Sequence, residues 1–139
     1  QWLEIDVLIN NAGIGATASK IISMKEEKFD NIMKVNARSV FLMCKYFGKK
    51  MKKRKVDEKS LRGKIINMSS MRGLKGRAMF GAYSASKAAV LSITETLSIE
   101  LGKNRITVNA ICPGLIHTPI YGKITYEDLG KMGEPVFLD

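Results

Sequence analysis

Tyr83 and Lys87 stand four residues apart in the stretch GAYSASKAAV, residues 81–90. If this stretch is helical, positions i and i+4 lie on one face, so the phenol and the ammonium group can approach each other. A free phenol has a pKa of about 10, and an adjacent positive charge lowers such a pKa by roughly 1–3 units. The pair can therefore supply a general acid or base near neutral pH. A helix-starting tyrosine followed by an exposed lysine would give the same spacing without any chemistry.

Two further polar residues could belong to the same site. Ser70 precedes Tyr83 by 13 residues and follows an apolar run that predicts a strand. Its hydroxyl could hydrogen-bond a substrate oxygen held against the phenol, although alone it would be an ordinary loop serine. Asn36 lies in a segment of helical periodicity, where asparagine is a poor helix former, and a solvent-facing position would account for it equally well.

The apolar pattern predicts the elements that must position these residues. Apolar, β-rich runs predict strands at 5–10, 64–68 and 105–112, and residues 69–81 read as a loop. Apolar residues recur every three or four positions over 26–52 and 82–102, which predicts two helices. The expected buried stripes are Phe29, Met33, Ala37, Val40, Cys44 and Phe47 on the first helix, and Ala82, Ala85, Ala89, Ile93, Leu97 and Leu101 on the second. Alternating strands and helices predict an α/β fold with a parallel sheet and right-handed crossovers.

Ligands of such sheets bind beyond the carboxyl ends of the strands, which here are residues 10–18, 68–76 and 112–119. The first segment contains GIGATA, residues 13–18, which matches the G-x-G-x-x-A dinucleotide pattern. The acidic residue that should end a second strand about 20 positions later is replaced by helical sequence. We therefore do not interpret GIGATA as that fingerprint.

The composition excludes several classes of function. The net charge of +10 is concentrated in residues 49–55, which hold six basic side chains and leave +4 for the rest. This run is typical of a solvated helix C-terminus; phosphate binding is the alternative, but without interleaved aromatic residues no nucleic-acid partner is expected. No apolar run is long enough to span a membrane, and no cluster predicts a metal site. Cys44 and Cys112 lie in apolar stretches, as reduced thiols of a cytoplasmic protein would.

The sequence resembles the short-chain dehydrogenase/reductase family. The resemblance rests on NNAG (10–13), Asn36, INMSS (66–70), YSASK (83–87) and PGLIHT (113–118), in the order and spacing of the family. It implies a Rossmann-like, doubly wound parallel sheet in which the three predicted strands are the fourth, fifth and sixth of the family fold. The likeness fades beyond Thr118, where the family carries a variable substrate loop.

The resemblance implies interconversion of an alcohol and a carbonyl by hydride transfer with NAD or NADP. Tyr83 would exchange a proton with the substrate oxygen, Lys87 would lower the pKa of the phenol and hold the nicotinamide ribose, Ser70 would orient the substrate, and Asn36 would hold a water of the proton relay. The implied cofactor contacts are Asn11, Ala12 and Gly13 on the adenosine side, with Pro113, Gly114, Ile116 and Thr118 beside the nicotinamide. A 3-oxoacyl reductase, a sugar or polyol dehydrogenase and a hydroxysteroid-type enzyme would share these motifs.

Family members also carry three strands and a glycine-rich turn before NNAG, and a helix and a strand after the matching part. We therefore expect residues 1–139 to be the catalytic half of one NAD(P)-binding domain, without a second domain and inactive in isolation. In the family, helices corresponding to 26–52 and 82–102 pack against a neighbouring subunit, which implies a homodimer or homotetramer. The alternative hypothesis is a non-catalytic, truncated relative that acts only in subunit association.

Overall fold

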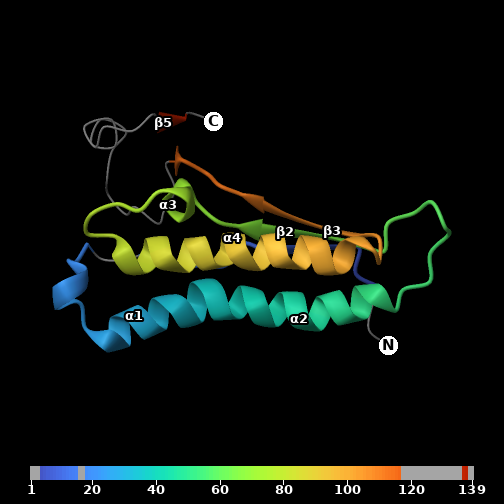
Figure 1. The fold of residues 1–139 in the computed structure, drawn as a ribbon, viewed down its shortest axis with the longest axis horizontal. Coiled ribbons are helices and arrows are strands. Elements are labelled where there is room, and N and C mark those ends of the chain that lie inside the picture. The colour runs from blue at the N-terminus through green and yellow to red at the C-terminus, as the bar shows by residue number, and fades with distance from the viewer. Residues whose placement is uncertain (1–3, 16–17, 117–135, 138–139) are drawn as a thin grey trace.

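A computed structural model of the chain describes residues 4–15, 18–116 and 136–137 (Figure 1). Three parallel strands form one sheet in the order β1-β2-β3. The strands are β1 (Val7–Asn10), β2 (Gly63–Met68) and β3 (Ile106–Ile111). They confirm the three predicted strands, and the helices between them give the predicted α/β, Rossmann-like arrangement.

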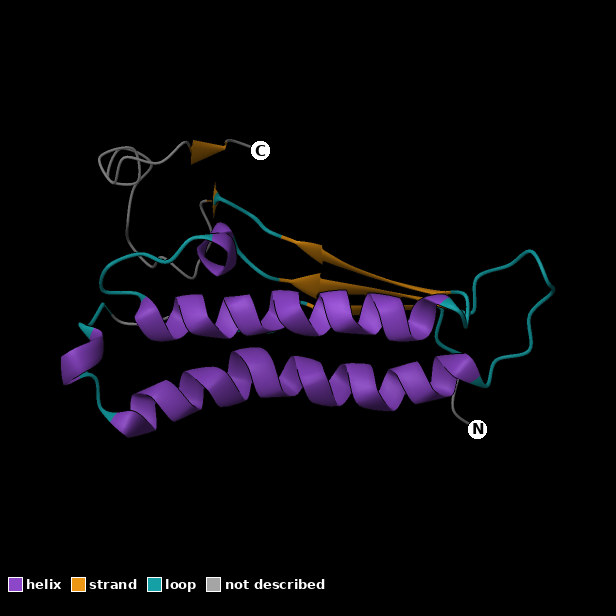
Figure 2. Cartoon of the chain, in the orientation of Figure 1, coloured by secondary structure: helices purple, strands orange, loops and turns teal. Residues whose placement is uncertain are grey.

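Two long helical segments lie side by side on one face of this sheet (Figures 1 and 2). They comprise α1 (Glu26–Met33), η2 (Lys34–Arg38) and α2 (Ser39–Lys52) in continuous succession, and α4 (Gly81–Gly102). Alternate strand residues point to opposite faces. Leu8 therefore faces the helices and is buried, whereas Ile9 points to the opposite face and is 59% exposed.

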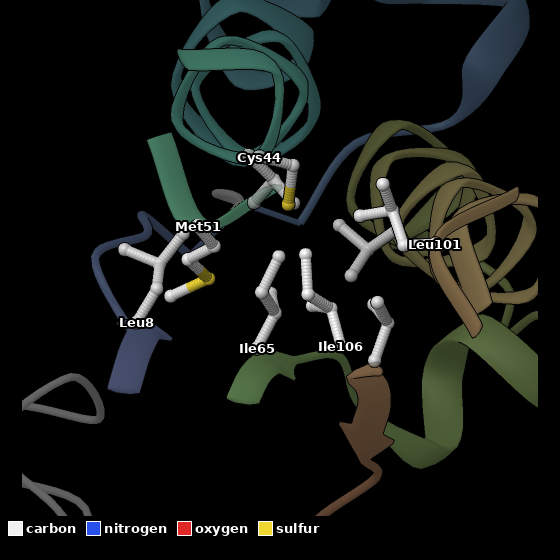
Figure 3. Close-up of a cluster of buried hydrophobic side chains, with 9 residues drawn as sticks. Leu8, Cys44, Met51, Ile65, Leu101 and Ile106 are labelled. Atoms are coloured by element: carbon white, nitrogen blue, oxygen red, sulfur yellow. The ribbon is translucent and has the colours of Figure 1, made fainter. Parts of the chain in front are cut away.

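The apolar core fills the space between the helices and the sheet (Figure 3). Cys44 from α2 and Leu101 from α4 meet Ile65 and Ile106, which project from neighbouring strands. The other members are Leu8, Val40, Met51, Val90 and Val108. This packing sets the distance between α4 and the end of β2, where the candidate site lies.

The predicted stripe on the first helix is wrong at its beginning. Phe29 is 40% exposed, whereas Ile32 is buried. The helix takes a π-helical turn at η2, which holds more residues than an α-helical turn and rotates the buried face. The α-helical spacing that correctly predicts the burial of Val40 and Cys44 therefore fails on the other side of this turn, at Phe29.

The predicted stripe on the second helix is also partly wrong, because Ala85 is exposed. Much of the buried face is polar and comprises Ser84, Ser86, Lys87 and Thr94. Three of these side chains, Ser86, Lys87 and Thr94, donate hydrogen bonds to backbone carbonyls, which allows them to be buried. A count of apolar residues alone therefore misplaces the face.

Several short elements were not predicted from the sequence. The one-turn helix α3 (Met71–Leu74) lies in the segment expected to be a loop, and the short helix η1 (Ile21–Ser23) precedes α1. β4 (Leu115–Ile116) pairs in parallel with β5 (Val136–Phe137). No helix in the described ranges is long and apolar enough to cross a membrane.

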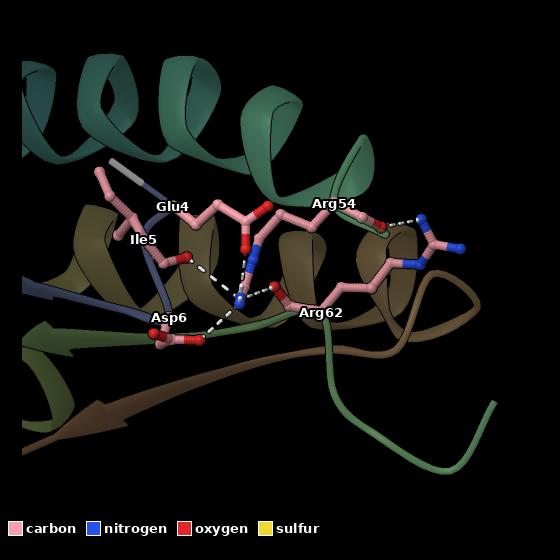
Figure 4. A network of polar contacts seen from close by, with 5 residues as sticks. All are labelled: Glu4, Ile5, Asp6, Arg54 and Arg62. Atoms are coloured by element: carbon pink, nitrogen blue, oxygen red, sulfur yellow. Dashed lines mark hydrogen bonds and ion pairs between the residues drawn. The ribbon is translucent and has the colours of Figure 1, made fainter. Parts of the chain in front are cut away.

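Arg54, within the basic run, joins the segment before β1 to the segment before β2, at the end of the sheet opposite the candidate site (Figure 4). Its Nη1 donates to the carbonyl oxygens of Ile5 at 3.3 Å and Arg62 at 2.6 Å, and its Nη2 lies 2.6 Å from Asp6 Oδ1. Arg62 in turn donates to the carbonyl oxygen of Arg54 at 2.8 Å. The neighbouring lysines are exposed as expected of a solvated helix end, but Arg54 is a structural residue.

Candidate functional site

Tyr83 and Lys87 come together on the first turns of α4. Lys87 is only 6% exposed, and its Nζ lies 5.7 Å from the centre of the Tyr83 ring. The same Nζ donates to the carbonyl oxygen of Met68, the last residue of β2, at 2.8 Å. Burial lowers the pKa of Lys87 below its ordinary value. The i, i+4 spacing thus brings an ammonium group against the phenol, at the carboxyl end of a strand.

Ser70 lies two residues after Met68, and its side chain caps the N-terminus of α3. Ser70 Oγ accepts a hydrogen bond from the backbone N–H of Arg72 at 3.1 Å, which is the usual role of an N-cap serine. Because the oxygen serves as acceptor, the hydroxyl proton of this half-buried residue can still be donated. A structural role and a substrate contact are therefore compatible at Ser70.

Asn36 is 1% exposed, so a solvent-facing position is wrong. Its Oδ1 accepts from the backbone N–H of Ile14 at 2.8 Å, and its Nδ2 donates to the carbonyl oxygen of Ile14 at 3.0 Å. The same Nδ2 donates to Ser86 Oγ at 3.1 Å. The side chain therefore fastens the segment after β1 to α4, and both of its N–H donors are used.

Of the residues expected to contact a cofactor, Gly13 lies beside Asn36 and Lys87. Gly13 approaches closely, since a Cβ at that position would stand 3.2 Å from Asn36 Oδ1 and 3.6 Å from Lys87 Nζ. Asn11 and Ala12, which precede it at the end of β1, are exposed. Because Gly13 has no side chain, the space beside the Lys87 ammonium group stays free of protein atoms that any other residue at position 13 would place there.

The end of β3 joins the same edge of the sheet. The backbone N–H of Met71 donates to the carbonyl oxygen of Pro113 at 3.0 Å, directly after Ser70. Pro113, Gly114 and Ile116 are half-buried there. Thr118, the remaining expected contact, lies outside the described residues.

Sequence reasoning missed three contributors to the site. The carbonyl of Met68 holds Lys87, Ser69 Oγ donates to the backbone carbonyl of Lys87 at 2.8 Å, and Ser86 accepts from Asn36. The pattern of side chains does not show which backbone carbonyl will accept a hydrogen bond from a lysine, so the contribution of Met68 could not be predicted. The two serines could have been found as small polar residues at positions where a packed helix and strand should be apolar.

Within the described ranges, no group of three or more His, Cys, Asp or Glu side chains could hold a metal ion. Cys44 and Cys112 are free thiols, and burial raises the pKa of Cys44. The chemistry that Tyr83 and Lys87 can supply is proton exchange by a phenol beside an ammonium group.

Comparisons with known proteins agree with this arrangement. A family model described as short chain dehydrogenase matches residues 1–128. The chain is 37% identical to the 3-oxoacyl-[acyl-carrier-protein] reductase FabG of Thermotoga maritima, over 97% of this chain and 56% of that protein. It is 38% identical to the L-2,3-butanediol dehydrogenase of Corynebacterium glutamicum, over 94% of this chain and 48% of that protein.

A solved structure of NAD+-bound xylitol dehydrogenase superimposes with a TM-score of 0.75 and 31% identity, over 83% of this chain and 42% of that one. The chain thus spans about half the length of the curated relatives it matches, 56% of one and 48% of another.

Proposed function

Because this chain belongs to the short-chain dehydrogenase/reductase family, we propose that the full-length protein, meaning the product of its complete coding sequence, interconverts an alcohol and a carbonyl compound with NAD or NADP. The observation that supports this most directly is the buried ammonium of Lys87, 5.7 Å from the Tyr83 ring and bonded to Met68. A buried cation beside a phenol is costly for a fold, and such groups concentrate at functional sites.

Tyr83 is the proposed proton donor and acceptor. In alcohol oxidation its phenolate accepts the hydroxyl proton, and in carbonyl reduction its phenol returns a proton to the oxygen. The neighbouring Lys87 ammonium favours the phenolate by Coulombic attraction. Ser70 donates its hydroxyl proton in a hydrogen bond to the same substrate oxygen, since its own oxygen accepts from Arg72. The nicotinamide, when bound, supplies or accepts the hydride.

The residues present fit the nicotinamide end of such a cofactor. Protonated lysine has three N–H donors, so Lys87 retains two beyond its bond to Met68 for the ribose hydroxyls. The family resemblance puts Asn11, Ala12 and Gly13 on the adenosine side. Because a Cβ at Gly13 would stand 3.6 Å from Lys87 Nζ, we propose that Gly13 instead borders the nicotinamide ribose, while Asn11 and Ala12, which are exposed, remain the proposed adenosine-side contacts. Pro113, Gly114, Ile116 and Thr118 are the proposed contacts on the nicotinamide side.

Asn36 is proposed to hold a relay water. Both N–H donors of its carboxamide are engaged by Ile14 and Ser86, which leaves the second lone pair of Oδ1 as an acceptor for a water. The side chain itself would then act on the reaction by fixing the segment that holds Gly13.

The proposal is tested by assaying the purified full-length protein with NAD and NADP on a 3-oxoacyl thioester, a vicinal diol and a polyol. Nicotinamide-dependent turnover of one of these classes is the expected result. Binding of neither nicotinamide, with no turnover, would overturn the proposal. The choice among the three substrates also distinguishes the activities named for the relatives.

A second proposal concerns association. The outer side of α2 carries Phe41, Met43 and Tyr46, each at least 40% exposed, and Lys45 lies 5.7 Å from the Phe41 ring. We propose a homodimer or homotetramer formed through this face and α4. If the full-length protein self-associates without binding a nicotinamide cofactor, the non-catalytic association role is the better description; sedimentation together with cofactor titration separates the two.

A further inference from the structure

The end of β2 bonds to α4 through three successive residues. Asn67 Nδ2 donates to Thr94 Oγ1 at 2.9 Å, and the Met68 carbonyl accepts from Lys87 Nζ at 2.8 Å. Ser69 Oγ donates to the backbone carbonyl of Lys87, also at 2.8 Å. Lys87 is therefore held at its side chain by the last residue of β2 and at its backbone by the residue that follows the strand.

The bond to Thr94 belongs to a buried chain of defined direction. Asn10 and Asn67 are register partners in the sheet, and Asn10 Nδ2 donates to Asn67 Oδ1 at 2.7 Å. Thr94 Oγ1, which accepts from Asn67, in turn donates a hydrogen bond to the carbonyl oxygen of Val90 at 2.7 Å. These hydrogen bonds therefore connect β1, β2 and α4, starting from the residue before Met68 in β2.

The backbone carbonyl of Lys87 also packs closely against Gly73 of α3. A Cβ at Gly73, within α3, would stand 2.8 Å from the carbonyl carbon and oxygen of Lys87 and from Ser69 Oγ. The backbone of α3 is thus in close contact with both partners of the hydrogen bond between Ser69 Oγ and the Lys87 carbonyl. Little free space surrounds this carbonyl, so the position of α4 along β2 is sharply determined.

We propose that Ser69 and Thr94 are positioning residues for the reaction proposed above. By fixing α4 against the end of β2, they set the distance from Lys87 Nζ to the Met68 carbonyl, which orients the ammonium beside the Tyr83 ring, and the distance from Tyr83 to Ser70, which follows Ser69 in the chain. The inference rests on the proposed function for its catalytic meaning, but the placement of Lys87 can be measured without it. The competing explanation is that the two hydroxyls only stabilise the fold.

Variants of the full-length protein separate these explanations. Ser69→Ala removes the hydroxyl on the Lys87 carbonyl. Thr94→Val keeps the shape of threonine but leaves Asn67 Nδ2 without its acceptor, whereas Thr94→Ser retains the hydroxyl. Ser98→Ala is the matched control, because among the described residues the Ser98 hydroxyl bonds within its own turn of α4, to the carbonyl of Glu95 at 2.7 Å.

We expect Ser69→Ala and Thr94→Val to lower kcat about 10- to 100-fold with KM little changed, since small misplacements of reacting groups cost this much. The acid limb of the pH profile for alcohol oxidation should move to higher pH, because a displaced ammonium favours the Tyr83 phenolate less. Thr94→Ser and Ser98→Ala should keep the original profile. Lower melting temperatures with an unmoved acid limb would overturn the positioning role.

A readout independent of activity keeps the inference separate from the proposed function. NMR of lysine-labelled protein follows the titration of Lys87, whose signal is assigned by its loss in Lys87→Met. In Ser69→Ala this titration should move toward the range of an exposed lysine. If it moves while even the unaltered protein lacks nicotinamide-dependent turnover, the proposed function fails and the positioning of Lys87 stands. An unmoved titration contradicts the inference, and Ser69→Ala decides the matter alone if Thr94→Val does not fold.

Discussion

The side-chain nitrogen of Lys87 lies 2.8 Å from the carbonyl oxygen of Met68, in a site where the lysine is almost fully buried. The carbonyl supplies one hydrogen bond to the ammonium, but burial still lowers the pKa of Lys87. The fold therefore bears a cost for keeping a charged group next to Tyr83. This cost gives a prediction that can be measured by unfolding.

Stability should rise with pH in the alkaline range through Lys87. Its pKa is lower in the folded chain than the ordinary value of 10.5, so between the two values the unfolded chain binds the extra proton. The free energy of unfolding then increases with pH by at most about 1.4 kcal/mol per pH unit. Urea unfolding of the full-length protein and of Lys87→Met should show that the unaltered protein gains stability relative to the variant as the pH approaches 10.5.

Cys44 makes the free energy of unfolding fall with rising pH, opposite to the effect of Lys87. The comparison with Lys87→Met removes this contribution. Burial raises its pKa above the ordinary 9.0, so the stability that the protonated thiol contributes is lost as the pH rises through its folded value. Both proteins contain Cys44, so this contribution cancels in the difference. A difference that is independent of pH would show that Lys87 is not buried as the structure places it.

Tyr83→Phe should reduce kcat/KM by about 10²–10⁴-fold, because it removes the proposed proton donor while retaining the ring. Melting temperature and cofactor affinity should change little. Ser98→Ala, which removes a hydroxyl that bonds within its own turn of α4, is the control and should keep full activity. Equal rates in the two variants would exclude Tyr83 as the acid or base.

Asn36→Leu should destabilise the protein by about 2–4 kcal/mol, because it leaves the backbone groups of Ile14 and the hydroxyl of Ser86 without their partners. Asn31→Leu replaces an exposed asparagine on the same helix and should stay within about 0.5 kcal/mol. Chemical denaturation of both variants gives the comparison. Similar losses in the two would mean that the buried bonds of Asn36 contribute nothing specific.

The sequence predicted the elements well because strands and helices differ in the period of their apolar residues. The three strands and the Tyr83–Lys87 spacing depend on such local patterns. The buried face of α4 could not be found in this way, since Lys87 and Thr94 are buried through hydrogen bonds rather than apolar character. The π-helical turn shifted the predicted stripe near Phe29, and the contribution of Met68 comes from a backbone atom.

Gly13 offers the most direct test of where a cofactor would lie. Gly13→Ala places a methyl group 3.2 Å from Asn36 Oδ1 and 3.6 Å from Lys87 Nζ, in the space proposed for the nicotinamide ribose. Cofactor affinity should fall about tenfold, equivalent to about 1.4 kcal/mol, when followed by fluorescence titration with NADH and NADPH. Gly76→Ala is the matched control, because a Cβ there meets nothing within 4 Å. Unchanged affinity in Gly13→Ala would contradict a ribose bound against Gly13, because the added methyl group would occupy the space proposed for it.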